Sequence, residues 1–271
     1  MQKLPNSRRN LDLSIQRTFG ADYLNVRAIM ANVIVAQMLP GGAVKGGSAI
    51  KFRFGDTNTR FSDDLDTVYN KDLEGFISSL EDELTKGWNG FTGRVVPKPP
   101  AKPKNIPPHY VMQPFEIKLL YKEKSWLTVK LEVVHNEIGD ADSPEWGISS
   151  DIIELFESVG LPAPDPVPLM PLHHQIAQKL HGLSELGSKR AHDLIDLQLI
   201  VQNEAIDYPK TRATCERLFA YRNAQTWPPV ITKGYNWDSL YLDQLEEIDI
   251  STNVDDAIIW ANKLIASIKN A

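Results

Sequence analysis

The fold prediction starts from two short stretches, Gly46-Gly47-Ser48 and Arg60-Phe61-Ser62-Asp63-Asp64-Leu65-Asp66. From Arg60 to Tyr69 polar and apolar residues alternate, which predicts a β-strand with its acidic residues on one face. The rise of a strand places Asp64 and Asp66 roughly 7 Å apart on that face. Two such carboxylates repel each other unless a cation lies between them, and Mg²⁺ prefers oxygen ligands of this kind. The stretch therefore predicts a catalytic metal site at Asp64 and Asp66.

The strand predicted from Thr128 to Val134 supplies a third carboxylate. A site that holds two Mg²⁺ ions during turnover, one for the attacking hydroxyl and one for the leaving pyrophosphate, calls for a further acidic ligand. Glu132 alternates away from the apolar residues and is the candidate, and Lys130 on the same face is expected to contact phosphate. Glu132 also has a simpler interpretation as a solvated surface residue.

The segment Gly46-Gly47-Ser48 is expected to form a turn that binds a triphosphate. Glycine lets the backbone approach a ligand closely and direct its N–H groups toward phosphate oxygens. A pair of glycines is more commonly just a turn, so this segment is informative only in combination with the acidic strand that follows it.

The predicted elements fall into two parts. The first part contains a helix over 13–39, an amphipathic helix over 72–84, and strands over 91–96, 115–121 and 128–134, the last two forming a hairpin. An extended loop is expected from Pro97 to Pro108. After the proline-rich stretch 162–171 the pattern is helical throughout, over 172–186, 189–202, 209–224, 237–247 and 253–269. We therefore expect an α+β fold, with a mixed sheet and flanking helices in residues 1–161 and a helical domain completing the active site in residues 162–271.

Composition narrows the class of protein. The chain has 271 residues and a net charge of -6, and its single cysteine, Cys215, excludes an internal disulfide. The apolar stretch Val26 to Leu39 is too short to span a bilayer, so a cytoplasmic location is expected. The window from Lys86 to Lys130 nevertheless carries nine basic residues against two acidic ones, which indicates either a phosphate-binding face or ordinary surface charge.

Two of the C-terminal helices carry further candidates. Lys179 flanks an apolar stripe and is expected to reach a phosphate, while Arg190 and Asp193 share a face three residues apart. Asp193 is expected to orient Lys179 or to hold the nucleoside, and Asp196 to cap or bridge. The alternative for Lys179 and Asp193 is a plain salt bridge between helices. Four histidines on these helices lack a metal-binding spacing, so zinc is not expected.

The whole pattern resembles the AbiEii/AbiGii nucleotidyltransferase toxins of the DNA polymerase β-like superfamily. The resemblance rests on Gly46-Gly47-Ser48, on Arg60-x-Ser62-x-Asp64-Leu65-Asp66, on a downstream acidic strand residue matched by Glu132, on Lys179, and on the run from Arg190 to Asp196. It implies that Arg60, Ser62 and Arg190 join Gly46, Gly47, Ser48 and Lys130 in substrate binding, and that Lys179 and Asp193 join the catalytic group. It further implies Mg²⁺-dependent transfer of a nucleotide from NTP to an RNA 3′ end, with tRNA as the expected acceptor, in a toxin–antitoxin or abortive-infection system with a cognate antitoxin.

Other functions remain open at this stage. The acceptor hydroxyl can belong to a small molecule such as an aminoglycoside or to a protein side chain, and a non-catalytic nucleotide-binding relative is the third alternative. Ionic strength separates the first two, because binding to RNA weakens steeply with salt.

Overall fold

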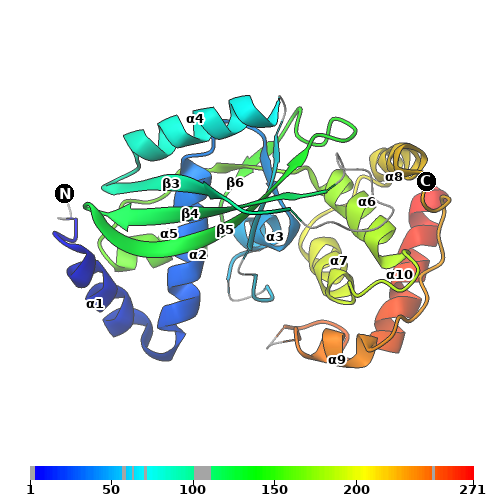
Figure 1. Cartoon of the computed structure of the whole chain (residues 1–271). Helices are drawn as coiled ribbons and strands as arrows, with labels where there is room; N and C mark the ends of the chain where they lie inside the picture. The colour runs from blue at the N-terminus through cyan, green and yellow to red at the C-terminus, as the bar shows by residue number, and fades with distance from the viewer. Residues whose placement is uncertain (1–3, 57–58, 63, 70–71, 101–110, 246–247) are drawn as a thin grey trace. The chain divides into compact units, whose positions relative to one another are not determined.

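The computed structural model describes residues 4–56, 59–62, 64–69, 72–100, 111–245 and 248–271. The chain forms two compact units, the first comprising Met1–Thr57, Phe61–Asn136 and Ala141–Leu169, and the second Asn58–Arg60, Glu137–Asp140 and Met170–Ala271. The first unit contains every strand of the described chain, and the second is helical (Figure 1). No helix among the described residues has the length and apolar character needed to cross a membrane.

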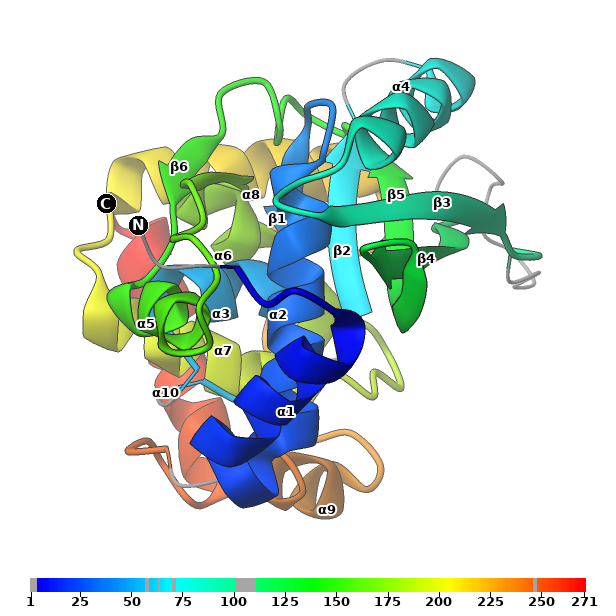
Figure 2. The ribbon, with the colours of Figure 1, turned by 90° about the vertical axis from the view of Figure 1, so that its left-hand side faces the viewer.

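A seven-stranded mixed sheet organises the first unit. Its order is β3-β4-β5-β2-β1-β7-β6, and β2 pairs parallel with β5, β1 pairs parallel with β7, and the other neighbours are antiparallel. The strands are β1 (Ala43–Lys45), β2 (Asp64–Tyr69), β3 (Phe91–Pro97), β4 (Gln113–Tyr121), β5 (Lys124–His135), β6 (Glu145–Gly147) and β7 (Val167–Leu169). Strands β1 and β2 lie side by side in the middle of the sheet (Figure 2). The expected α+β class with a mixed sheet is confirmed.

The helices of the first unit are α1 (Arg8–Phe19), the 3₁₀ turn η1 (Gly20–Asp22), α2 (Tyr23–Gln37), α3 (Gly46–Phe54), α4 (Leu73–Lys86) and α5 (Ser150–Ser158). Helix α4 lies along β3 (cyan in Figure 1) and buries Phe76, Leu80 and Leu84. Its predicted cap is confirmed, because the Asp72 carboxylate accepts a hydrogen bond from the Gly75 amide at 2.6 Å.

Alternation gives the middle of β3, β4 and β5 one buried and one more exposed face. Odd-numbered positions such as Val95, Ile117 and Leu131 are buried in the core, while even-numbered positions such as Arg94 and Lys130 are exposed. The predicted hairpin between β4 and β5 is confirmed. Its turn lies at Lys122 and Glu123, which have left-handed φ of 46° and 64°, so β5 begins earlier than expected.

Several predicted boundaries are wrong. The single helix expected over 13–39 is two helices, because Gly20 ends α1 with φ 53°. The expected turn at Gly46-Gly47-Ser48 is instead the first turn of α3, and the strand expected from Arg60 begins at Asp64. The short strands β1, β6 and β7 and helix α5 were not predicted. The loop expected from Pro97 to Pro108 is described only as far as residue 100.

The second unit contains α6 (Leu172–Leu183), α7 (His192–Asn203), α8 (Tyr208–Arg222), α9 (Trp237–Leu242) and α10 (Val254–Lys269), which confirms the expected helical C-terminal part. Helix α6 packs against both α7 and α8. The indole of Trp237 is buried and donates to the carbonyl of Ser188 at 2.7 Å. Strand β7 lies within the proline-rich stretch 162–171, and the division into domains 1–161 and 162–271, with the second completing the active site, stays a prediction.

Candidate active site

The three expected carboxylates lie together in the first unit. Strand register places Asp66 of β2 beside Glu132 of β5 and, on its other side, beside Lys45 of β1. One step along the same face, Asp64 lies beside Lys130, whose ammonium is 3.3 Å from Oδ1 of Asp64. Because paired residues on neighbouring strands share a face about 5 Å apart, the sheet places the carboxylates of Asp66 and Glu132 side by side, with Lys45 on one side of them and Lys130 in the next row. We call Asp64, Asp66 and Glu132 the acidic group.

Gly46 lies directly against the acidic group. Its φ of 65° is left-handed, and a Cβ at this position would clash with Oδ2 of Asp66. Glycine is therefore required here for both conformation and space. The absence of a side chain at Gly46 leaves room for the Asp66 carboxylate beside the first turn of α3.

Ser48 fixes the start of α3 to the acidic strand. Its hydroxyl is buried and donates to the backbone carbonyl of Asp64 at 2.6 Å. Gly46 and Gly47 occupy the first turn of the helix, where amide N–H groups lack partners within the helix and the helix dipole favours an anion. A helix start of this kind can bind an anion, and here it lies next to a pair of carboxylates.

The electrostatics of the acidic group favour a cation. Burial, followed by repulsion from Asp66 and Asp64, raises the pKa of Glu132 above its ordinary value, although Lys45 and Lys130 oppose the shift. Oδ1 of Asp64 is buried, and it lies 3.3 Å from the Lys130 ammonium without a hydrogen bond among the described residues. A bound cation would offset the repulsion around Glu132.

The donor set fits a divalent ion held jointly with a ligand. Among the described residues, no three His, Cys, Asp or Glu side chains are arranged to hold one metal ion by themselves. Mg²⁺ commonly takes only one or two protein carboxylates and completes its octahedron with water and substrate phosphates. Asp64 and Asp66, with Glu132 beside them, meet that requirement once a nucleotide supplies the other oxygens.

The second unit holds a buried ion cluster around Lys179. The ammonium of Lys179 donates to Asp193 at 2.9 Å and to Asp196 at 2.6 Å. Arg60 makes two bonds to Asp196, at 2.8 and 2.9 Å, and Arg190 donates to Asp193 at 2.5 Å. Asp193 and Asp196 are 0% and 1% exposed, so three cations enclose two fully buried carboxylates.

The cations keep these aspartates ionised. Burial works to raise the pKa of Asp193, but Lys179 and Arg190 outweigh it and hold the pKa well below its ordinary range. Burial also works to raise the pKa of Asp196, but Arg60 and Lys179 outweigh it, so that pKa is lowered as well. Burial lowers the pKa of the neighbouring His192 to about 4, so its ring is neutral at pH 7.

The structure thus brings the expected site residues together in two groups. Gly46, Gly47, Ser48, Asp64, Asp66, Lys130 and Glu132 lie in the first unit, where Ser62 is half-buried just before β2. Arg60, Lys179, Arg190 and Asp193 lie in the second, and their expected contacts with substrate stay a prediction. Lys45 was missed in the sequence, although it directly precedes the glycine pair. Asp196 was expected to bridge, and it does.

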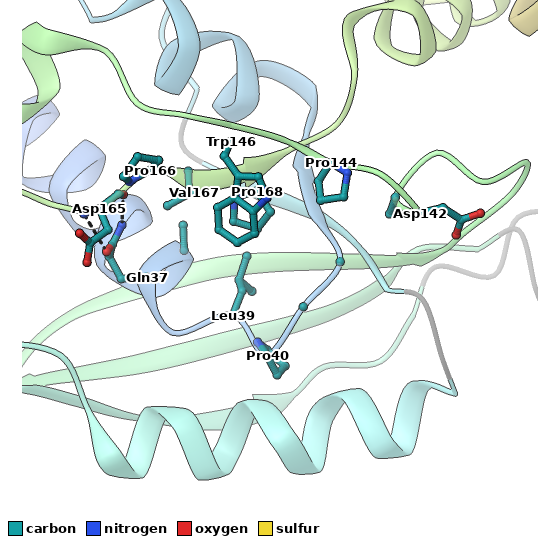
Figure 3. A pocket seen from close by; sticks show the side chains of 14 residues that line it. Gln37, Leu39, Pro40, Asp142, Pro144, Trp146, Asp165, Pro166, Val167 and Pro168 are labelled. Carbon is teal, nitrogen blue, oxygen red and sulfur yellow. Dashed lines mark hydrogen bonds between the residues drawn. The ribbon is translucent and has the colours of Figure 1, made fainter.

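The first unit also contains a cavity of about 410 Å³ that is separate from the acidic group. It is lined mainly by apolar residues, including Leu39, Pro144, Trp146 and Pro168, together with Asp142 and Asp165 (Figure 3). None of the expected site residues lines it. The cavity and the carboxylates of β2 and β5 are therefore two different places on the first unit.

Comparison with known proteins gives one family match. The family model described as nucleotidyl transferase AbiEii toxin of a type IV toxin–antitoxin system matches residues 30–261. No curated protein sequence matches the chain.

Among solved structures, the chain is similar to MenT4, a nucleotidyltransferase toxin from Mycobacterium tuberculosis H37Rv, with 16% identity, a TM-score of 0.51, and coverage of 97% of this chain and 98% of that one. It is also similar to JHP933 from Helicobacter pylori, with 12% identity, a TM-score of 0.44 and coverage of 91% of each chain. At this identity the likeness to MenT4 shows the fold alone.

Proposed function

Because the chain belongs to the AbiEii nucleotidyltransferase toxin family, we propose that it transfers a nucleotide from NTP to the 3′ hydroxyl of an RNA, with tRNA as the acceptor. The family makes the chain a nucleotidyltransferase and a toxin of a toxin–antitoxin system. The acceptor, the requirement for Mg²⁺, the cognate antitoxin and a role in abortive infection belong to the proposal.

A single observation supports the reaction most strongly. Asp64, Asp66 and Glu132 occupy neighbouring positions of two paired strands, beside a helix start kept open by Gly46. Asp64 and Asp66 would hold Mg²⁺, with Glu132 as the third ligand. Mg²⁺ bound there would neutralise phosphate charge and lower the pKa of an attacking hydroxyl.

The chain's own residues supply the remaining requirements. The amide groups at the start of α3 bind the triphosphate oxygens, and Lys45 and Lys130 add positive charge on either side of the acidic group. In the transfer the acceptor oxygen bonds to the α-phosphorus of the NTP, the bond to pyrophosphate breaks, and the hydroxyl proton passes to solvent water. Positioning and charge stabilisation provide most of the acceleration in reactions of this kind.

The test is transfer of label from each of four α-³²P-labelled NTPs to total cellular RNA. We expect a labelled band at tRNA size with one or more of the NTPs, and its loss in Asp64→Asn, which keeps the side-chain shape but removes the charge. The matched control is Asp12→Asn, since Asp12 lies on α1 and pairs with Arg8 and Arg27. Full activity of Asp64→Asn would refute the metal site. Absence of label on RNA with all four NTPs, despite Mg²⁺–NTP binding, would refute the RNA acceptor.

A further inference from the structure

The exposed face of β3, β4 and β5 carries a run of basic side chains that ends at the acidic group. Register pairs Arg94 with Lys118, and the adjacent row pairs Glu116 with Lys130. Lys98 follows β3 and is linked to β4 by its amide, which donates to the carbonyl of Pro114. We call Arg94, Lys98, Lys118 and Lys130 the cationic face.

The cationic face keeps its positive charge in a chain of net charge -6. The same face of β3, β4 and β5 carries two carboxylates, those of Glu116 and Glu132, which with the four cations leaves a net charge of +2 (4 − 2). Glu116 binds Lys98 at 2.8 Å and Lys118 at 2.6 Å, and the hydrogen bonds from these lysines lower its pKa. The side chains of Lys98, Lys118 and Lys130 remain 44%, 37% and 62% exposed. Exposed cations fixed in register suit a polyanion better than a single ion.

The position and length of the cationic face indicate what kind of ligand it binds. Lys130 lies beside Asp64, so the face is continuous with the acidic group. From β3 to β2 it crosses three strand spacings, about 14 Å. That reach matches several phosphates along a chain, whereas the triphosphate of an NTP needs only the start of α3. The basic residues Lys86 and Lys124 of the same sequence window lie elsewhere, on α4 and at the hairpin end of β5.

We propose that the cationic face binds the phosphodiester backbone of the acceptor RNA, with the 3′ end at Asp64 and Asp66 and the preceding nucleotides running past Lys130 and Lys118 toward Arg94. This inference rests on the proposed function, which sets the 3′ end of the RNA at the acidic group, and it adds the path that the rest of the RNA chain follows. It also gives the site a length dependence, because a dinucleotide acceptor is too short to reach Arg94.

The test compares the double variant Arg94→Gln/Lys118→Gln with the matched control Lys86→Gln/Lys124→Gln, which removes equal charge from the same unit. Binding of a 5′-fluorescein-labelled tRNA transcript is measured across a salt series. Each phosphate contact with single-stranded nucleic acid contributes about 0.7 to the slope of log affinity against log salt, so the slope should fall by about 1.4 in the first variant only. We expect KM for tRNA to rise severalfold with kcat unchanged, and a dinucleotide acceptor to react equally well with every variant.

The possible outcomes separate this inference from the proposed function. Equal salt slopes for the two double variants, or no tRNA binding by the unmodified chain, would overturn the cationic face as the RNA path. Loss of dinucleotide transfer in Arg94→Gln/Lys118→Gln would also overturn it, since the change would then act on the catalytic centre. Loss of poly-glutamate binding with tRNA binding intact would assign the face to an acidic protein instead. The proposed reaction is judged independently by Asp64→Asn.

Discussion

Replacement of Lys179 by methionine tests the buried ion cluster most directly. The ammonium bonds to Asp193 and Asp196 at 2.9 and 2.6 Å, and both carboxylates are buried. Methionine fills much of the space but leaves the two carboxylates facing one fewer cation. Removing one partner of a buried ion pair lowers the free energy of unfolding by about 3–5 kcal/mol, because the charge that remains is not solvated. We expect Lys179→Met to lower the stability of the second unit by that amount.

The loss should depend on pH in a defined direction. Asp193 has a lowered pKa in the folded chain, so its contribution to stability is complete above its unfolded pKa and is lost as the pH falls through the folded value. In Lys179→Met the folded pKa of Asp193 moves back up, and the variant loses less stability on acidification. The difference between the two proteins should therefore be full at pH 7 and shrink below about pH 4.

Native-state hydrogen exchange of the amides in α6 and α7 is the appropriate assay, since a chain of two units need not unfold in one step. Arg212→Met on α8 is the matched control. Its pair with Glu216 is 44% and 49% exposed, and removing such a pair changes stability by about 1 kcal/mol or less. Unchanged exchange in Lys179→Met, together with lost nucleotide transfer, would falsify the structural role and leave the phosphate contact as the function of Lys179.

Two further predictions concern the acidic group. Gly46→Ala should abolish Mg²⁺–NTP binding in calorimetry, because its Cβ displaces Asp66. The control Gly20→Ala is also at positive φ but has open space around it, so it should lower the stability of the chain by about 1–2 kcal/mol and bind Mg²⁺–NTP normally. Equal binding by both variants would contradict the role of Gly46. Glu132→Gln should raise the melting temperature at pH 7 in EDTA, because the raised pKa of Glu132 means that its negative charge opposes folding at that pH. The gain should vanish below about pH 4, where the carboxyl is protonated in the folded and the unfolded chain. A lower melting temperature in Glu132→Gln would show that its charge is stabilised instead.

The face of each central strand could be predicted from local alternation. Asp64, Asp66, Lys130 and Glu132 all lie on the faces that the sequence indicated, because side chains of a strand alternate whatever its neighbours are. Strands β1, β6 and β7 were missed because three residues are too few to show a period. The start of α3 was missed because two adjacent glycines favour a turn and carry no helical pattern.

Long-range partners were harder to predict. Arg60 was expected to bind substrate, and the structure pairs its guanidinium with Asp196, far along the chain. The same holds for the basic window from Lys86 to Lys130, because strand pairing places Lys118 and Lys130 on the cationic face while Lys86 and Lys124 lie elsewhere. Neither pairing leaves a local signature, because each depends on which elements pack together.

Periodicity and side-chain chemistry within short windows were enough to predict the class of fold, the helical C-terminal part, the acidic strand and the residue types of the candidate site. The tertiary structure decided that β5 is the parallel neighbour of β2, that Glu132 lies beside Asp66, and that Lys179 is enclosed by Asp193 and Asp196. The physical reason is that strand register and helix packing are set by burial summed over the whole core, and a local pattern is compatible with many such arrangements.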